Sequence, residues 1–229
     1  MRLVLVPGFT QTKESWDAVI GELRRAGGGP EVRVVAAQPG HAWDDAVCRL
    51  AADGGHGTWV GYSMGGRLAL AVALDHPTLV DHLVLVSATA GIRDDVSRRQ
   101  RVADDEALAA SIETDGVAVF LDRWLAQPMF VRVPPDATGL ADRRRWSARD
   151  LASVLRNLGT GAMPNLWDRL GELTVRVTIV TGVHDTKFDA IGDELAAACA
   201  RAEVRRVRRD TGHAVPLEDP SFLAAIMTG

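Results

Sequence analysis

The sequence has few of the groups that bind metals, cross-link chains or attract polyanions. Its 229 residues include only two cysteines, Cys48 and Cys199, whose separation fits no metal or redox motif. We expect both to be small buried hydrophobic residues in a reducing compartment, and no metal or cofactor. The formal net charge is -4, from 26 basic and 30 acidic residues, so nothing in the composition favours binding to nucleic acid.

Long apolar runs are also missing. The run LALAVAL at 68–74 is much shorter than the roughly 20 residues that a membrane helix needs, so we expect no membrane insertion. After Met1 and Arg2 the chain enters the apolar run LVLVPGF, with no charged leader or cleavage site. We therefore expect a cytoplasmic protein. The length and the apolar content predict one sizeable core. We expect a monomer or a homodimer.

Short β-rich runs alternate with stretches of helical spacing along most of the chain. The expected strands are 2–6, 32–36, 57–61, 82–87, 175–181 and 203–208. The expected helices are 14–26, 42–53, 64–76, 189–201 and 219–227, with stop signals such as GGGP at 27–30. This alternation predicts an α/β fold with a mostly parallel, doubly wound sheet of about six strands.

The alternation breaks after the strand at 82–87. Residues 91–169 are mostly helical and rich in Arg, Asp and Ala, and they contain no convincing strand. We interpret this segment as a helical cap inserted over the carboxyl edge of the sheet. Residues 1–90 and 170–229 would then form the core.

The hexapeptide GYSMGG at 61–66 lies where a strand pattern changes directly into a helix pattern. A Gly-x-Ser-x-Gly sequence at such a corner is typical of a nucleophile elbow, in which Gly61 and Gly65 leave room for a strained turn that exposes the hydroxyl of Ser63. An ordinary tight turn is the alternative. The flanking strand and helix patterns favour the elbow.

An activated serine requires a histidine, and that histidine requires an acid to fix its tautomer. Only His213 follows all the other elements of the expected Ser, acid, His order; it lies in a glycine-containing loop, where an exposed ring could reach the elbow. The alternative is a surface-loop histidine. Asp185 follows the strand at 175–181 and would lie at the same sheet edge, so it is the expected acid.

Acyl-transfer and related chemistry also needs donors for a developing oxyanion. The N–H of Met64, directly after the serine, is one candidate. The other is the N–H of Phe9 in the loop VPGFTQT, where Gly8 allows close approach of the backbone. A simple glycine turn remains the alternative for this loop.

Together these residues resemble the α/β-hydrolase fold over the whole chain. A narrower resemblance lies in the cap and after it: the stretches FLDRWLAQPMF, LRNLGTGAMPNLWDRL and TGVHDTKF are similar to the MenH family of 2-succinyl-6-hydroxy-2,4-cyclohexadiene-1-carboxylate synthases. That resemblance implies a cofactor-free lyase in menaquinone biosynthesis. In that family the triad acts as a base on a small cyclohexene substrate that bears several carboxylates, and pyruvate is eliminated from it.

The resemblance also implies cations that bind the carboxylates. Arg67 lies one turn into the helix after the serine, Arg101 matches the cap arginine of the family, and one arginine of the run 143–145, Arg145 in our prediction, matches another. Guanidinium groups suit this task because they bind carboxylates in a bidentate manner. The alternative is that the cap arginines form solvated surface pairs.

Tyr62 and Trp124 match pocket-lining aromatic residues of the family, although Trp124 could equally be a core residue of the cap. The chain departs from the family pattern around the pocket, for example at Pro7-Gly8 and Met163-Pro164, which leaves the substrate open. A serine hydrolase, either a carboxylesterase or a C–C bond hydrolase acting through an acyl-enzyme at Ser63, is therefore the second hypothesis. A non-catalytic binding module is a third, disfavoured because all triad positions are filled.

Overall fold

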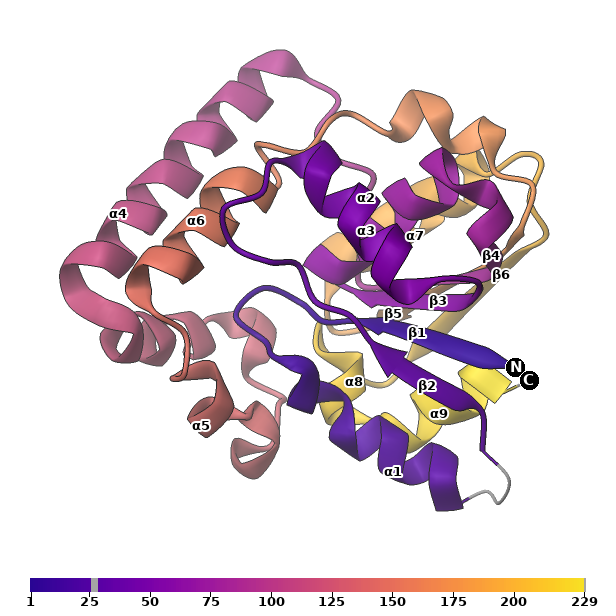
Figure 1. The fold of residues 1–229 in the computed structure, drawn as a ribbon, viewed down its shortest axis with the longest axis horizontal. Coiled ribbons are helices and arrows are strands. Elements are labelled where there is room, and N and C mark those ends of the chain that lie inside the picture. The colour runs from indigo at the N-terminus through magenta and orange to yellow at the C-terminus, as the bar shows by residue number, and fades with distance from the viewer. Residues whose placement is uncertain (26–28, 229) are drawn as a thin grey trace.

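The computed structural model describes residues 1–25 and 29–228 (Figure 1). Within these residues, one parallel sheet has the strand order β2-β1-β3-β4-β5-β6, which confirms the predicted fold class. The strands are β1 (Arg2–Val6), β2 (Glu31–Val34), β3 (Gly57–Tyr62), β4 (Val80–Val86), β5 (Arg176–Gly182) and β6 (Val204–Arg209). Each expected strand is present within about two residues of its predicted bounds.

Helices cover both faces of the sheet (Figure 1). One face packs against α2 (Trp43–Gly54), α3 (Met64–Asp75) and α7 (Thr186–Ala198), and the other against α1 (Asp17–Arg25), α8 (Val215–Glu218) and α9 (Pro220–Thr228). The pleat explains the division, because successive strand residues point to opposite faces. In β1, Val4 and Val6 join the first cluster and Leu3 and Leu5 the second.

The first helix and the two cysteines differ in part from what the sequence predicts. The predicted end of the first helix and its GGGP stop overlap residues 26–28, which lie outside the described residues. Cys199 is buried as expected, and burial raises the pKa of its thiol to about 11. The expectation for Cys48 is wrong, because its side chain is exposed on the outer side of α2, between the inward-facing Val47 and Leu50.

The segment between β4 and β5 contains α4 (Asp95–Leu125), α5 (Leu140–Arg143), α6 (Ala148–Leu158) and several 3-10 turns. The long helix α4 begins at Asp94, whose carboxylate accepts the N–H of Ser97, and it bends at Gly116, where φ is 82°. Side chains from α4 and α6 form a separate apolar cluster that includes Ile112, Phe120 and Leu151. We call this segment the cap.

The chain enters and leaves the cap at neighbouring points. The N–H of Leu166 donates to the carbonyl of Ala90 at 2.9 Å, and the indole Nε1–H of Trp167 donates to the carbonyl of Gly91 at 2.9 Å. Gly91 has a φ of 105°, and a Cβ there would lie 3.0 Å from the carbonyl oxygen of Pro164. These contacts tie the base of the cap to the carboxyl edge of the sheet.

Candidate active site

The corner between β3 and α3 requires small residues at two positions, as the sequence predicted. Ser63 has φ 53° and ψ -111°, a strained conformation for a residue with a side chain. A Cβ on Gly61 would lie 2.3 Å from the carbonyl oxygen of Gly65, and a Cβ on Gly65 would lie 2.1 Å from that of Val6. The glycines therefore allow the corner to pack directly against β1.

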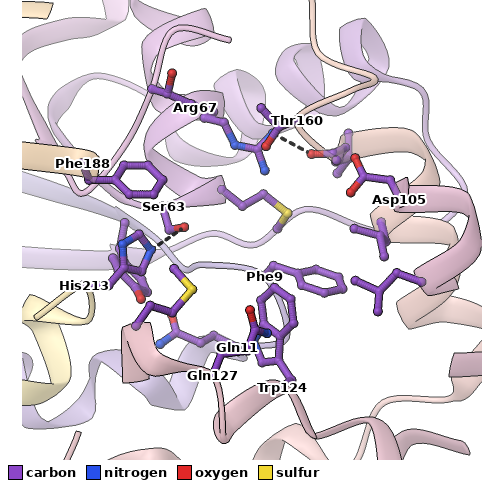
Figure 2. Close-up of a pocket in the computed structure, with 18 of the residues that line it drawn as sticks. Phe9, Gln11, Ser63, Arg67, Asp105, Trp124, Gln127, Thr160, Phe188 and His213 are labelled. Atoms are coloured by element: carbon purple, nitrogen blue, oxygen red, sulfur yellow. Dashed lines mark hydrogen bonds between the residues drawn. The ribbon is translucent and has the colours of Figure 1, made fainter. Parts of the chain in front are cut away.

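The structure brings Ser63, His213 and Asp185 into one chain of hydrogen bonds. Figure 2 shows the bond between Ser63 and His213. The hydroxyl of Ser63 lies 3.2 Å from Nε2 of His213, and Nδ1 of the same ring lies 2.5 Å from Oδ2 of Asp185. These partners assign the proton to Nδ1, which donates to the carboxylate and leaves Nε2 free to accept from the serine. The other carboxylate oxygen of Asp185 accepts the N–H of Phe188 at 3.4 Å and so begins α7.

His213 is not exposed, contrary to the sequence-based expectation. Its side chain is 1% exposed, because aromatic rings surround it. The rings of Phe188, Tyr62 and Phe130 lie with their centroids 4.6, 5.5 and 6.2 Å from the imidazole centroid. The imidazole can therefore reach a ligand only through the cavity that it lines.

The N–H groups of Phe9 and Met64 lie in the two segments that flank Ser63, and among the described residues neither has a hydrogen-bond partner. The loop that carries Phe9 is fixed locally, since the N–H of Gly8 donates to Oε1 of Gln11 at 2.9 Å. Thr10 adopts a left-handed φ of 68°. Both N–H groups are thus available to a ligand, as an oxyanion site requires.

The cap holds this same loop. The indole Nε1–H of Trp146 donates to the carbonyl of Thr10 at 3.1 Å, and the guanidinium of Arg143 donates to the hydroxyl of Thr10. The loop next to the serine is therefore held by a hydrogen bond within the loop and by two hydrogen bonds from the cap.

A cavity of about 410 Å³ opens in front of Ser63, between the sheet edge and the cap. We call its two walls the sheet side and the cap side. The sheet side comprises Phe9, Gln11, Tyr62, Ser63, Met64, Arg67, Thr89, Lys187, Phe188 and His213. The cap side comprises Arg101, Asp104, Asp105, Leu108, Trp124, Gln127, Met129, Phe130, Arg143, Leu155, Leu158, Gly159 and Thr160.

Arg67 is a buried cation at the end of the cavity away from His213 (Figure 2). Its side chain is 7% exposed, and its Nη1 donates to the carbonyl of Leu158 at 2.9 Å. Burial lowers the pKa of Arg67 to about 9, with a further lowering by the charge of Arg101 and a partial opposing effect of Asp105. The guanidinium is therefore charged at neutral pH but poorly compensated.

Arg101 lines the cap side, as predicted, but it is paired. Its Nε donates to Oδ1 of Asp105 at 2.7 Å, while the other carboxylate oxygen of Asp105 accepts the N–H of Gly161 at 3.2 Å. The Asp105 side chain is 6% exposed and that of Arg101 is 37% exposed. Among the described residues, the two terminal nitrogens of Arg101 have no hydrogen-bond partner, so the cation can bind an anion while keeping Asp105.

The choice of Arg145 was wrong. Its side chain is 65% exposed and pairs with Asp142 and Glu14 outside the cavity. Arg143, two residues earlier, is 3% exposed and lines the cavity instead. It ends the short helix α5, whose turn directs Arg143 inward and Arg145 outward. Burial lowers the pKa of Arg143, which the partial charge of Tyr62 opposes.

Tyr62 and Trp124 both line the cavity, as the resemblance implied. Trp124 also packs edge-on against Phe9 at 5.3 Å and stacks on Phe120 at 5.7 Å between ring centroids. The two interpretations of Trp124, pocket wall and cap core, are therefore both correct. Burial raises the pKa of the Tyr62 hydroxyl far above its ordinary value, so it is a neutral donor.

Several polar residues of the cavity were not predicted: Gln11, Asp105, Gln127, Thr160 and Lys187. Lys187 was detectable, because it follows Asp185 closely at the start of a helix on the expected sheet edge. Gln11 lies in the loop after β1, where it accepts the N–H of Gly8, and no residue pattern marks that role. Asp105, Gln127 and Thr160 depend on how the cap folds over the sheet.

Residues 1–25 and 29–228 contain no group of three His, Cys, Asp or Glu side chains arranged to hold a metal ion. No helix within the same ranges combines the length and apolarity that a membrane crossing requires.

A parallel α/β sheet with an elbow serine linked to a histidine and an acid at its carboxyl edge is typical of alpha/beta hydrolases. The model of the alpha/beta hydrolase family matches residues 3–226, and the chain belongs to that family.

Within the family, the similarity points to one group of enzymes. The chain is 35% identical over 174 residues to a putative 2-succinyl-6-hydroxy-2,4-cyclohexadiene-1-carboxylate synthase of Bacillus subtilis, covering 74% of this chain and 63% of that protein. It is 30% identical over 169 residues to the synthase of the same name from Escherichia coli, covering 72% of this chain and 64% of that one. The matched part is thus a little under two thirds of these curated relatives' length.

Two solved structures superpose on all or nearly all of the chain. MenH from S. aureus superposes with a TM-score of 0.88 at 26% identity, covering 100% of this chain and 92% of that one. An enol-lactonase from Burkholderia xenovorans superposes with a TM-score of 0.78 at 19% identity, covering 99% and 89%. The second likeness concerns the fold alone.

Proposed function

We propose that this protein is a MenH-like carbon-oxygen lyase. It eliminates pyruvate from 2-succinyl-5-enolpyruvyl-6-hydroxy-3-cyclohexene-1-carboxylate in menaquinone biosynthesis. The observation that carries the proposal is the set of buried or half-buried guanidinium groups, Arg67, Arg101 and Arg143, in the same cavity as Ser63 and His213. Such cations serve a substrate with several carboxylates, whereas a simple ester needs none. The similarity to the B. subtilis protein supports the same reaction.

In this reaction Ser63, activated by His213, removes a proton from a ring carbon of the substrate. The electron pair forms a new ring double bond while the C–O bond to the enolpyruvyl group breaks. Pyruvate leaves as its enolate and takes up the proton that the imidazolium holds, so no water is consumed. Asp185 stabilises the imidazolium and keeps its orientation.

The negative charge that develops during proton removal requires donors placed in advance. The N–H groups of Phe9 and Met64 fill this role. Arg67 and Arg101 bind carboxylates at the end of the cavity away from the histidine, where Asp105 keeps Arg101 oriented. A bound carboxylate would restore to Arg67 the compensating charge that it lacks, so substrate binding and burial of this cation favour each other.

The second candidate is a serine hydrolase that forms an acyl-enzyme on Ser63. The hydrogen-bonded triad supports it equally, because the same geometry generates a nucleophile. The two functions differ in the fate of the serine oxygen, which stays uncombined in the lyase.

A coupled assay separates the two functions. The preceding pathway intermediate is generated enzymatically, pyruvate release is followed, and samples taken during turnover are analysed by mass spectrometry. The lyase accelerates pyruvate release well beyond the spontaneous rate and carries no adduct on Ser63. Spontaneous-rate release together with fast hydrolysis of aryl esters and an acyl adduct would establish the hydrolase instead.

A further inference from the structure

Glu218 is a buried carboxylate beside His213 that the proposed reaction does not use. Its side chain is 4% exposed. One carboxylate oxygen accepts the N–H of Gly212 at 2.5 Å, and the other accepts the N–H of Ala214 at 3.0 Å. Gly212 and Ala214 are the residues immediately before and after His213. A single carboxylate thus fastens the backbone on both sides of the histidine.

The surroundings of Glu218 indicate that these two hydrogen bonds are its main partners. Burial of a carboxylate is unfavourable unless hydrogen bonds or a cation replace the lost water. The nearest cation, Arg132 of the cap, lies 4.0 Å away and is 44% exposed. Glu218 is the last residue of the single turn of α8, and its side chain reaches back over the start of that turn to residues 211–214, which we call the histidine loop.

The histidine loop has little room on its other side. A Cβ on Gly182, the last residue of β5, would lie 2.1 Å from the carbonyl oxygen of Gly212. A Cβ on Gly212 itself would lie 3.0 Å from Oε1 of Glu218. The loop is therefore enclosed between the end of β5 and the glutamate, and both contacts depend on glycine.

His213 must keep two hydrogen bonds at once, one to Ser63 at 3.2 Å and one to Asp185 at 2.5 Å. The aromatic rings around it restrict the ring but form no directional bond to its backbone. Displacement of a catalytic group by about 1 Å can cost on the order of 100-fold in rate.

We propose that Glu218 is a positioning residue that acts through His213. By accepting the N–H groups of Gly212 and Ala214, it fixes the backbone from which the imidazole reaches Ser63 and Asp185. The proposal rests on the proposed role of His213 as the group that activates Ser63. It concerns the turnover step and not substrate binding, because Glu218 does not line the cavity.

Glu218→Gln tests this role, because an amide offers one acceptor oxygen and turns its NH₂ group toward the second N–H. We expect kcat for pyruvate release to fall by about 10-fold to 100-fold while KM stays within about twofold. Asp219→Asn is the matched control: Asp219 is 17% exposed, accepts the N–H of Phe222 at 3.0 Å and pairs with Arg209. This control should lower thermal stability to a similar extent and leave kcat unchanged.

Two further readouts separate positioning from general stability. In a His213→Ala background, Glu218→Gln should not lower the residual rate further. The downfield proton NMR signal of the His213–Asp185 hydrogen bond should be present in the wild type and in Asp219→Asn, and broadened in Glu218→Gln. If Glu218→Gln does not fold, Glu218→Asp, which keeps the charge but shortens the reach, takes its place in every measurement.

The proposal is overturned if the folded variant keeps its kcat, if only KM changes, or if the residual rate of His213→Ala falls by the same factor. A different result would overturn the proposed function instead. If His213→Ala alone retains the wild-type rate of pyruvate release, His213 does not activate Ser63, whatever Glu218 does.

Discussion

The two sides of the cavity are built in different ways. On the sheet side, Ser63, Asp185 and His213 follow the carboxyl ends of β3, β5 and β6, so the sheet fixes their spacing. On the cap side, Arg101 and Arg143 depend on a long bent helix and a short turn, and individual side-chain contacts hold them. The triad at the sheet edge is suited to chemistry that tolerates little displacement, and the cap side, together with Arg67, to selecting the substrate.

The largest expected effect concerns the sheet side. Ser63→Ala or His213→Ala should reduce pyruvate release about a thousandfold or more, because each removes the base or its activator. The double variant should lose little beyond either single one, since the two groups act as a unit. Steady-state kinetics of the three proteins measure this, and independent, multiplying losses would contradict a shared function.

The next effect compares two neighbouring arginines. Arg143→Ala removes a buried guanidinium that lines the cavity and holds Thr10, so we expect kcat/KM to fall by about 10-fold or more. Arg145→Ala, its matched control, removes an exposed ion pair and should change kcat/KM by less than about twofold. Measuring kcat/KM for both variants tests this comparison. A larger loss of kcat/KM in Arg145→Ala than in Arg143→Ala would mean that Arg145 is the substrate-binding arginine.

The smallest effect is on stability. Because burial lowers the pKa of Arg67 to about 9, well below its value in the unfolded chain, the unfolded chain binds more protons above about pH 9, and this group's contribution to stability rises with pH there. Below about pH 9 the folded protein bears the full cost of the buried charge. At pH 7, Arg67→Met should therefore raise the free energy of unfolding by on the order of 1 kcal/mol while impairing activity.

Thermal unfolding at pH 7 and above pH 9 measures this difference. The gain over the wild type should shrink as pH rises through about 9. Arg101→Met is the control, because Arg101 is 37% exposed and its removal leaves Asp105 without a cation. Arg101→Met should therefore not raise the free energy of unfolding. If Arg101→Met is stabilised and Arg67→Met is destabilised, then Arg101 and not Arg67 is the poorly compensated cation.

The same contrast explains how much the sequence alone could predict. The elbow at Ser63, the strand ends that carry Asp185 and His213, and the glycines at 61 and 65 follow from local patterns, because each lies at a fixed distance from a strand. The burial of His213 and the inward direction of Arg143 could not be predicted. Both depend on contacts between segments far apart in the sequence: Tyr62, Phe130 and Phe188 surround His213, and Arg143 contacts Thr10. Glu218 was missed for a different reason: its partners are the backbone N–H groups of Gly212 and Ala214, which no pattern of residue types marks.

Arg101→Ala tests most directly the claim that the sheet side performs the chemistry and the cap side selects the substrate. Two quantities are measured on this variant: kcat/KM for pyruvate release, and the rate at which a neutral fluorophosphonate labels Ser63. We predict that the first falls by about 10-fold to 100-fold while the second stays within about twofold of the wild type. An equal loss in both would show that Arg101 supports the reacting groups themselves, and would contradict the division between the two sides.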